Sequence, residues 1–338
     1  MDLTNEQVLD VMLQRKPETT VPFSVWHHFT PVEFFDGLKK PEGVKQSLAG
    51  LKKYVDDVDP DFVKLMTDGF FHFPLPGVED PNDPDQLAKL QEIPADDPWI
   101  KAQVDLIKQQ LEVVHGKLAF YNIFSPLTYF KWALINFDPS NLAEGDKRFG
   151  ELYAKAPQVV EDALAKIAVG DKRLVQAVAK TGVEGIYYST QTIQAPDLID
   201  NHDFFTNVHE KIDLDVSQEI DQDFEVNILH ICGFEGFRNH LQWFTKYPYK
   251  VVNYAVNAEK VPLAEGKKIF PKQVILGGLD ITKDGTLYID VPEDAANNAV
   301  KIVKNAGKDR LILGADCTIQ RETPVVNITT VRDAVHQL

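Results

Sequence analysis

Three observations predict a single (β/α)8 barrel, an α/β fold of the TIM-barrel type. Eight short apolar runs, bounded by polar or turn residues, are spread along the 338-residue chain. Segments with helical spacing separate these runs, and strands that alternate with helices favour a parallel sheet. A chain of this length with 44% hydrophobic residues can bury one large core, so we expect one domain over residues 1–338. An open doubly wound sheet would use the same alternation and is the alternative.

The first expected element is an N-terminal helix. Thr4 and Gln7 have the spacing of a capping box, apolar residues follow, and the helix should end near Lys16-Pro17. We expect this helix to plug or flank the core. The eight predicted strands then cover residues 21–26, 61–67, 118–124, 185–189, 226–232, 250–256, 273–279 and 310–317.

Between the strands, helical spacing is clearest in residues 158–179, 203–220 and 234–246. Two stretches break the regular pattern. Residues 73–99 follow the second strand and carry six prolines, which excludes a long continuous helix. This Pro-rich loop is either a lid over the carboxyl ends of the strands or an ordinary surface insertion. Residues 137–158 contain Asp-Pro-Ser and Ala-Pro helix starts, which predict an extra helix between strands three and four.

Composition restricts the partners. The chain has 51 acidic and 35 basic residues, a net charge of -16, which repels nucleic acid and anionic membrane surfaces. It contains neither a long apolar run nor a basic-then-apolar leader, so we expect a cytoplasmic protein with a small-molecule substrate. Two cysteines cannot form a disulfide framework, which favours thiolate chemistry or metal binding.

The strongest candidate site is a metal centre at two strand ends. His230 and Cys232 lie two residues apart on a predicted strand, so their side chains point to the same face. Cys317, the other cysteine, ends the last apolar run. Two thiolates and an imidazole suit zinc and leave a fourth position for a substrate. The plain alternative is a buried histidine with two buried free cysteines.

Charge predicts what such a site does. Two thiolates cancel the two positive charges of zinc, so a thiol bound at the fourth position would lose its proton and stay nucleophilic. Strands five and eight are not neighbours, so Cys317 must reach across the barrel mouth. His28, after strand one, and Asp68, after strand two, are candidates for orienting a second substrate or accepting the proton. Routine structural roles are the alternative for both.

Further polar residues follow strands four, six and seven. They are Tyr187, Tyr188, Ser189, Gln191, Asn257, Glu259 and Asp280. The Gly277-Gly278 pair before Asp280 is interpreted as a packing feature rather than a phosphate site, because no full glycine fingerprint follows.

Three segments carry a resemblance to a known family. They are Leu229-His230-Ile231-Cys232-Gly233, the run Ile275-Leu276-Gly277-Gly278-Leu279-Asp280, and Leu313-Gly314-Ala315-Asp316-Cys317 with the following Glu322-Thr323-Pro324 and Asn327-Ile328. Over most of its length the chain resembles the uroporphyrinogen decarboxylase superfamily, and within it the zinc-dependent branch that contains methylcobalamin:coenzyme M methyltransferases. The resemblance implies that His230, Cys232 and Cys317 bind Zn2+. It also implies a thiol acceptor and a methyl donor that is a corrinoid on a partner protein or a small methylated compound.

The resemblance is also to cobalamin-independent methionine synthase, whose similar zinc site has an added Glu that Glu259 would supply here. The chain departs from the decarboxylases, which hold their substrate with an arginine-bearing segment near the first strand, where this chain has Trp26-His27-His28-Phe29-Thr30. Asp68 aligns with an aspartate of those enzymes. We therefore expect a zinc-dependent methyltransferase acting on a thiol. Uroporphyrinogen decarboxylation, a step of porphyrin biosynthesis, and a non-catalytic protein that binds zinc or a corrinoid are the alternatives.

Overall fold

The strands form one parallel sheet that curves into a barrel. The computed structural model describes residues 3–16, 20–30, 34, 36–67, 71–233, 236–289 and 291–338. The sheet has eight strands in the order β1-β8-β7-β6-β5-β4-β3-β2, and the pairs along this order are parallel. The strands are β1 Phe23–Ser24, β2 Phe62–Leu65, β3 Leu118–Phe124, β4 Gly185–Thr190, β5 Ile228–Ile231, β6 Val251–Tyr254, β7 Val274–Leu279 and β8 Leu311–Ala315.

Contacts between the first two strands bring the sheet edges together. The Asp61 backbone N–H donates to the Phe23 carbonyl at 3.0 Å, and the Ser24 hydroxyl donates to the Phe62 carbonyl at 2.7 Å. β1 also pairs with β8, so these bonds bridge the gap in the ring. The prediction of a (β/α)8 barrel, rather than an open sheet, is confirmed. Each of the eight predicted runs coincides with one strand, and only β4 extends beyond its run, to Thr190.

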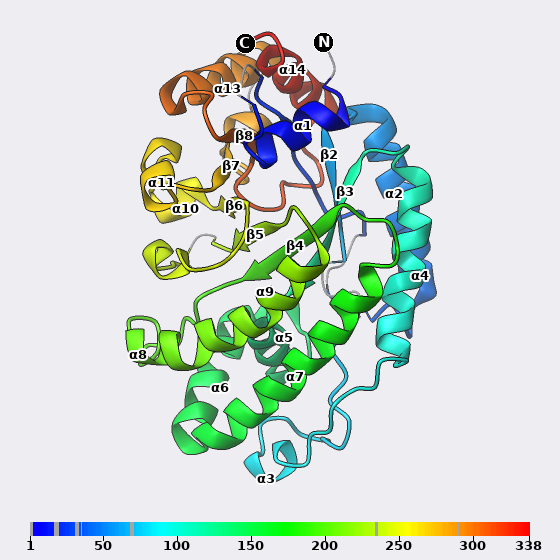
Figure 1. Ribbon diagram of the computed structural model, residues 1–338, viewed down its shortest axis with the longest axis vertical. Helices are drawn as coiled ribbons and strands as arrows, with labels where there is room; N and C mark the ends of the chain where they lie inside the picture. The colour runs from blue at the N-terminus through cyan, green and yellow to red at the C-terminus, as the bar shows by residue number, and fades with distance from the viewer. Residues whose placement is uncertain are drawn as a thin grey trace.

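Helices surround the strands (Figure 1). They are α1 Asn5–Met12, α2 Pro41–Val58, α3 Pro84–Leu87, α4 Pro98–Val113, α5 Pro126–Leu134, α6 Leu142–Lys155, α7 Pro157–Val178, α8 His202–Phe204, α9 Lys211–Asp223, α10 Val256–Glu259, α11 Leu263–Ile269, α12 Thr286–Ile289, α13 Pro292–Ala306 and α14 Val325–Val335. Two 3-10 helices, η1 Pro139–Asn141 and η3 Leu241–Phe244, and a π-helix, η2 Phe205–Glu210, complete the set of described helical segments. Among these residues, no helix has the length and apolar character needed to cross a membrane.

Prolines and caps set several helix starts. Pro98 and Pro126 stand at the first positions of α4 and α5, where a missing N–H costs no hydrogen bond. The Asp97 carboxylate accepts from the Trp99 N–H, and the Ser125 hydroxyl accepts from the Thr128 N–H, so each helix has a side-chain cap. The predicted extra helix between strands three and four is present as α6.

The first helix closes the amino-terminal end of the barrel. The capping box of Thr4 and Gln7 is formed. Val8, Val11 and Met12 pack into the hydrophobic cluster inside the amino-terminal half of the barrel. Asn5 donates to the Gly116 carbonyl just before β3. The expected plug is therefore confirmed. The helix ends at Met12, earlier than predicted, because Leu13 caps it and Gln14 adopts a φ of 53°.

One loop prediction needs correction, and the structure favours one of two alternatives for another loop. Residues 234–246 were predicted to be helical, but within the described part, 236–246, the structure has only the 3-10 helix η3. The backbone of this segment is held instead by tertiary bonds, such as that from the Asn239 N–H to Glu259 at 3.0 Å. The Pro-rich residues 73–99 pack along α7, where Lys166 donates to the Leu90 carbonyl at 2.8 Å. They are a surface insertion and contribute no side chain to the cavity described below.

Candidate metal centre

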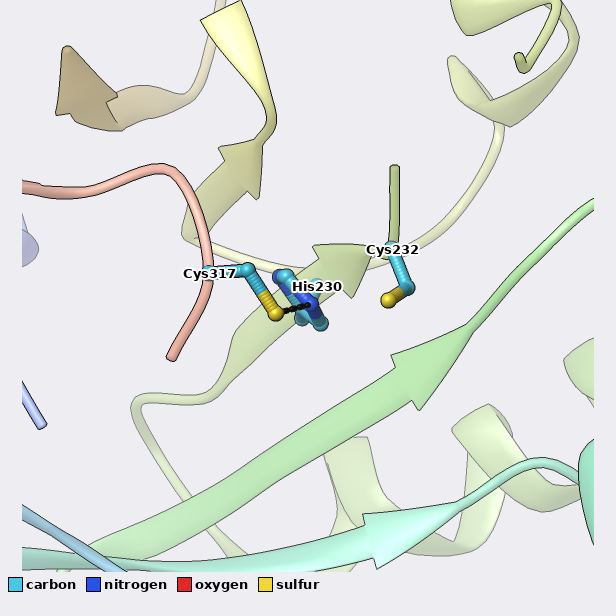
Figure 2. A group of neighbouring side chains, drawn as sticks. All are labelled: His230, Cys232 and Cys317. Atoms are coloured by element: carbon cyan, nitrogen blue, oxygen red, sulfur yellow. Dashed lines mark hydrogen bonds between the residues drawn. The ribbon is translucent and has the colours of Figure 1, made fainter. Parts of the chain in front are cut away.

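Three potential ligands converge at the carboxyl ends of the strands. His230 lies on β5 and is 2% exposed, Cys232 follows the end of β5, and Cys317 lies on the loop after β8. The ligand atoms lie within 4.8 Å of one another, and His230 Nε2 is 3.4 Å from Cys317 Sγ. Figure 2 shows both cysteine side chains directed toward the imidazole. Cys317 therefore does reach across the barrel mouth.

A buried asparagine determines which imidazole nitrogen faces the cysteines. The Asn253 amide nitrogen donates to the Leu276 and Ala315 carbonyls at 2.9 and 3.1 Å, so its oxygen points to the barrel centre. That oxygen lies 2.5 Å from His230 Nδ1 and also accepts from the Tyr187 hydroxyl at 2.7 Å. The proton of a neutral imidazole is thus held on Nδ1, which leaves the Nε2 lone pair directed at Cys317.

A second asparagine holds the segment that carries Cys232. The Asn239 side-chain nitrogen donates to the Cys232 carbonyl at 2.8 Å and to Glu259 at 2.6 Å. The Asn239 side-chain oxygen accepts from the Thr192 N–H at 2.8 Å. Glu259 was the candidate for an added ligand, but its carboxylate is bound by Asn239 and it is not part of the three-residue cluster. Its place in the structure is that of a positioning residue.

Cys317 is positioned by its neighbour Asp316. The Asp316 carboxylate accepts from the Asn257 N–H at 2.7 Å and from the Gly278 N–H at 3.0 Å. Burial raises the pKa of Asp316 to about 7. Because the Gly278 N–H is used in this way, the Gly277-Gly278 pair serves packing and positioning, as the sequence indicated.

The two thiols also differ electrostatically. A hydrogen bond with Cys232 lowers the pKa of Cys317 well below its usual value. The same bond, with burial, raises the pKa of Cys232. Two sulfurs and one imidazole nitrogen at this spacing, with the imidazole tautomer already selected, fit the ligand set of zinc.

The three potential ligands border a cavity of about 290 Å³. Its wall is largely apolar and includes Phe34, Phe124, Trp132 and Leu142. A wider cavity of about 990 Å³ adjoins it and is bordered by Gly233 and Asp316, the neighbours of two ligands. Phe237 and Ile281 line both cavities.

A lysine from inside the barrel adds positive charge near the sulfurs. Lys64 on β2 is 4% exposed, and its Nζ lies 4.5 Å from the centre of the Tyr187 ring. It also lines the smaller cavity, and its charge contributes to the lowered pKa of Cys317 while it opposes the rise in the pKa of Cys232. The quadrupole of a ring face attracts a cation, so the Tyr187 ring is a favourable neighbour for the Lys64 side chain.

The other predicted site residues divide into three groups. His28 lines the smaller cavity, as predicted, whereas His27 packs against Phe29 and Tyr54 and is structural. Asp68 lies outside the described residues. Tyr187, Ser189 and Gln191 lie at the centre, whereas the Tyr188 hydroxyl donates to Asp213 away from the site. Asn257 donates to Asp316, Asp280 accepts from the Thr282 N–H, and both line the wider cavity.

Sequence reasoning missed Lys64 and Asn253. Both lie within an apolar strand, where a buried polar side chain destabilises the fold unless it has a hydrogen-bonding or charged partner. That placement was the available signal, because only the barrel interior brings such residues close to the ends of other strands.

Comparisons with known proteins give one family match and several structural ones. The uroporphyrinogen decarboxylase family model matches residues 75–338. No curated protein matches the sequence. A methyltransferase from Methanosarcina mazei superposes with a TM-score of 0.68 at 16% identity, covering 100% of this chain and 99% of that chain.

Two further solved structures extend this likeness. A B12-independent methionine synthase from Shewanella sp. W3-18-1, in complex with selenomethionine, gives a TM-score of 0.57 at 13% identity over 94% of this chain and 95% of that one. Endo-glycoceramidase II from a Rhodococcus species gives 0.52 at 12% identity over 92% and 78%. These identities show a shared fold alone, and a barrel of this kind supports unrelated chemistries.

Proposed function

The chain belongs to the uroporphyrinogen decarboxylase family, and from this premise we propose that it is a zinc-dependent enzyme that transfers a methyl group to a thiol. The observation that carries the proposal is the convergence of His230, Cys232 and Cys317 within 4.8 Å beside an apolar cavity. The similar solved structures include a methyltransferase and a methionine synthase, which supports methyl transfer. Zinc held by the three residues would lower the pKa of a substrate thiol and hold the resulting thiolate.

The residues of the chain prepare this chemistry. Asn253 holds the imidazole proton on Nδ1 of His230, so Nε2 is available as a ligand. Asn239 and Asp316 hold the backbone next to the two cysteines. The aromatic wall limits the water that can reach the thiolate, which keeps the sulfur weakly solvated and nucleophilic.

The reaction forms one bond and breaks one. The substrate thiolate bonds to the methyl carbon, while the bond from that carbon to the donor breaks and its electron pair stays with the donor. We assign the smaller cavity to the thiol and the wider one to the donor, a corrinoid on a partner protein or a small methylated compound. His28 and, outside the described residues, Asp68 are proposed to orient the donor or to accept the proton that the thiol releases.

A spectroscopic titration tests the proposal. Zinc-loaded protein is titrated with small thiols while the zinc X-ray absorption edge is recorded. We expect an added sulfur ligand at the metal and release of one proton per thiol bound. A protein that takes up no zinc under reducing conditions, or a zinc with four protein ligands and no response to any thiol, would contradict thiol activation. Decarboxylation of uroporphyrinogen by the metal-free protein would instead favour the decarboxylase alternative.

A further inference from the structure

The side-chain amide of Gln191 lies at the cavity wall, where its oxygen has a hydrogen-bond partner and its nitrogen has none among the described residues. Gln191 follows β4, is 6% exposed and lines the smaller cavity with the three potential ligands. Its Oε1 accepts a hydrogen bond from Lys131 Nζ at 2.6 Å. Among the described residues, its Nε2 has no hydrogen-bond partner.

Lys131 fixes the orientation of this amide. The Lys131 ammonium is 3% exposed and binds both oxygens of Asp146, itself 1% exposed, at 2.9 and 3.2 Å. An ammonium group only donates, so the Gln191 atom that faces it must be the oxygen. The amide cannot be turned over without losing this bond. Its N–H donors therefore point away from Lys131.

The charge of Lys131 is already balanced by Asp146, and its three hydrogens face three oxygens. It is thus an anchor and is not available to bind a substrate. The nearby cavity wall is mainly aromatic and aliphatic, with Phe124, Trp132 and Leu142 among its members. A buried amide donor without a partner is unfavourable, and a ligand that supplies an acceptor removes that penalty.

We propose that Gln191 is a substrate-binding residue whose Nε2 donates a hydrogen bond to a carbonyl-type oxygen of the molecule in the cavity. The assignment rests on the proposed function for the identity of the substrate as a thiol. The proposal limits the methyl-accepting substrate to a small thiol that carries a ketone, amide or carboxylate oxygen a few bonds from its sulfur. A purely aliphatic thiol would leave the Gln191 donor unsatisfied and would bind less well.

A matched pair of probes tests this assignment. The probes are 4-mercapto-2-butanone and 3-methyl-1-butanethiol. The ketone oxygen of the first can accept a hydrogen bond, and in the second a methyl group replaces that oxygen. Their dissociation constants are measured by calorimetry on the zinc-loaded wild type and on Gln191→Glu. The glutamate keeps an oxygen for Lys131 but presents an oxygen where Nε2 was. The preference for the butanone should fall about tenfold, as expected for loss of a buried hydrogen bond.

Gln242→Glu is the control variant, because Gln242 is exposed on η3 and the substitution adds the same charge. It should leave the preference unchanged. A third probe, 3-mercaptopropionate, separates the acceptor classes: if its affinity exceeds that of the butanone in the wild type, the natural acceptor is a carboxylate. An unchanged preference in Gln191→Glu, with both thiols bound by the wild type, would overturn the role of Gln191 and leave the proposed function intact.

If neither thiol binds the wild type, the proposed function fails, and a second measurement still decides the role of Gln191. The 1H-15N signals of its side-chain amide are followed in metal-free wild-type protein during titration with 2-butanone, with 2-methylbutane as the apolar control. A shift with the ketone alone supports the hydrogen bond. Equal responses to both compounds, or none to the ketone, would show that the amide does not recognise an acceptor. This measurement requires no substitution to fold.

Discussion

His230 Nδ1 lies 2.5 Å from Asn253 Oδ1, and both residues are buried in the barrel centre. The contact joins β5 to the neighbouring strand β6, in the register that pairs His230 with Asn253. Asn253, which is not one of the three clustered residues, therefore determines which nitrogen of His230 faces the cysteines.

Replacing Asn253 should weaken zinc binding without removing a ligand. We expect Asn253→Leu to lower zinc affinity about 10- to 100-fold, because the imidazole loses the acceptor that orients it. Asn253→Asp keeps an acceptor for His230 and for the Tyr187 hydroxyl, and it should retain more affinity than the leucine variant. Competition with a chromophoric chelator measures both. Equal losses in the two variants would mean that the contact does not tune the metal site.

Loss of either cysteine should remove metal and activity together. A serine hydroxyl stays protonated near neutral pH and is a poor zinc ligand, so Cys232→Ser and Cys317→Ser are each expected to bind much less than one zinc per chain. Metal analysis after dialysis, with circular dichroism as the check on folding, measures this. Because the chain has two cysteines, each variant leaves one thiol, which a thiol reagent can count. A variant that keeps stoichiometric zinc would exclude that cysteine as a ligand.

His28 should affect turnover and not metal content. It lines the smaller cavity but is not one of the three clustered ligands. We expect His28→Ala to lower kcat about 10²- to 10⁴-fold if the imidazole transfers a proton, with zinc bound as in the wild type. His27→Ala, at the packed neighbour, is the matched control and should affect stability more than rate. The same test applies to Asp68→Asn, and a loss of zinc in either site variant would contradict the assigned roles.

A buried acid outside the site should make stability depend on pH. Asp171 on α7 is fully buried, and neither carboxylate oxygen has a partner among the described residues. Burial, with a smaller effect of Asp213, raises the pKa of Asp171 well above its usual value. The folded protein therefore holds a proton that the unfolded chain releases. Its contribution to stability is complete below the ordinary aspartate pKa and is lost as the pH rises toward the folded-state pKa.

Asp171→Asn should cancel this dependence. The free energy of unfolding of the variant, relative to wild type, should increase with pH by about 1.4 kcal/mol per pH unit between the two pKa values. Urea unfolding at several pH values from 4 upward measures the difference. Asp197→Asn, at an exposed turn, is the control and should show no such slope. Parallel curves for wild type and Asp171→Asn would show that the acid is ionised or hydrated in the folded state.

The sequence by itself predicted the barrel and the three residues that cluster at its mouth. Period-two spacing placed His230 and Cys232 on one face, and eight apolar runs alternating with helical segments predicted the strands that the structure contains. These features depend on local patterning, which the order of residues records directly. The capping box at Thr4 and the helix starts at proline could be predicted because they too depend on a few neighbouring residues.

Tertiary structure alone decided the rest of the site. Curvature of the sheet brings Cys317 to 3.4 Å from His230, although 87 residues separate them in the chain. The same curvature places Asn253 and Lys64 inside the barrel, and it places Glu259 against Asn239 rather than within the cluster of potential ligands. Residues 236–246 had helical spacing, yet they form only the short 3-10 helix η3, and the Asn239 N–H binds Glu259 instead of a helical carbonyl. Distances between residues far apart in sequence depend on how the ring of strands closes, and no local pattern carries that information.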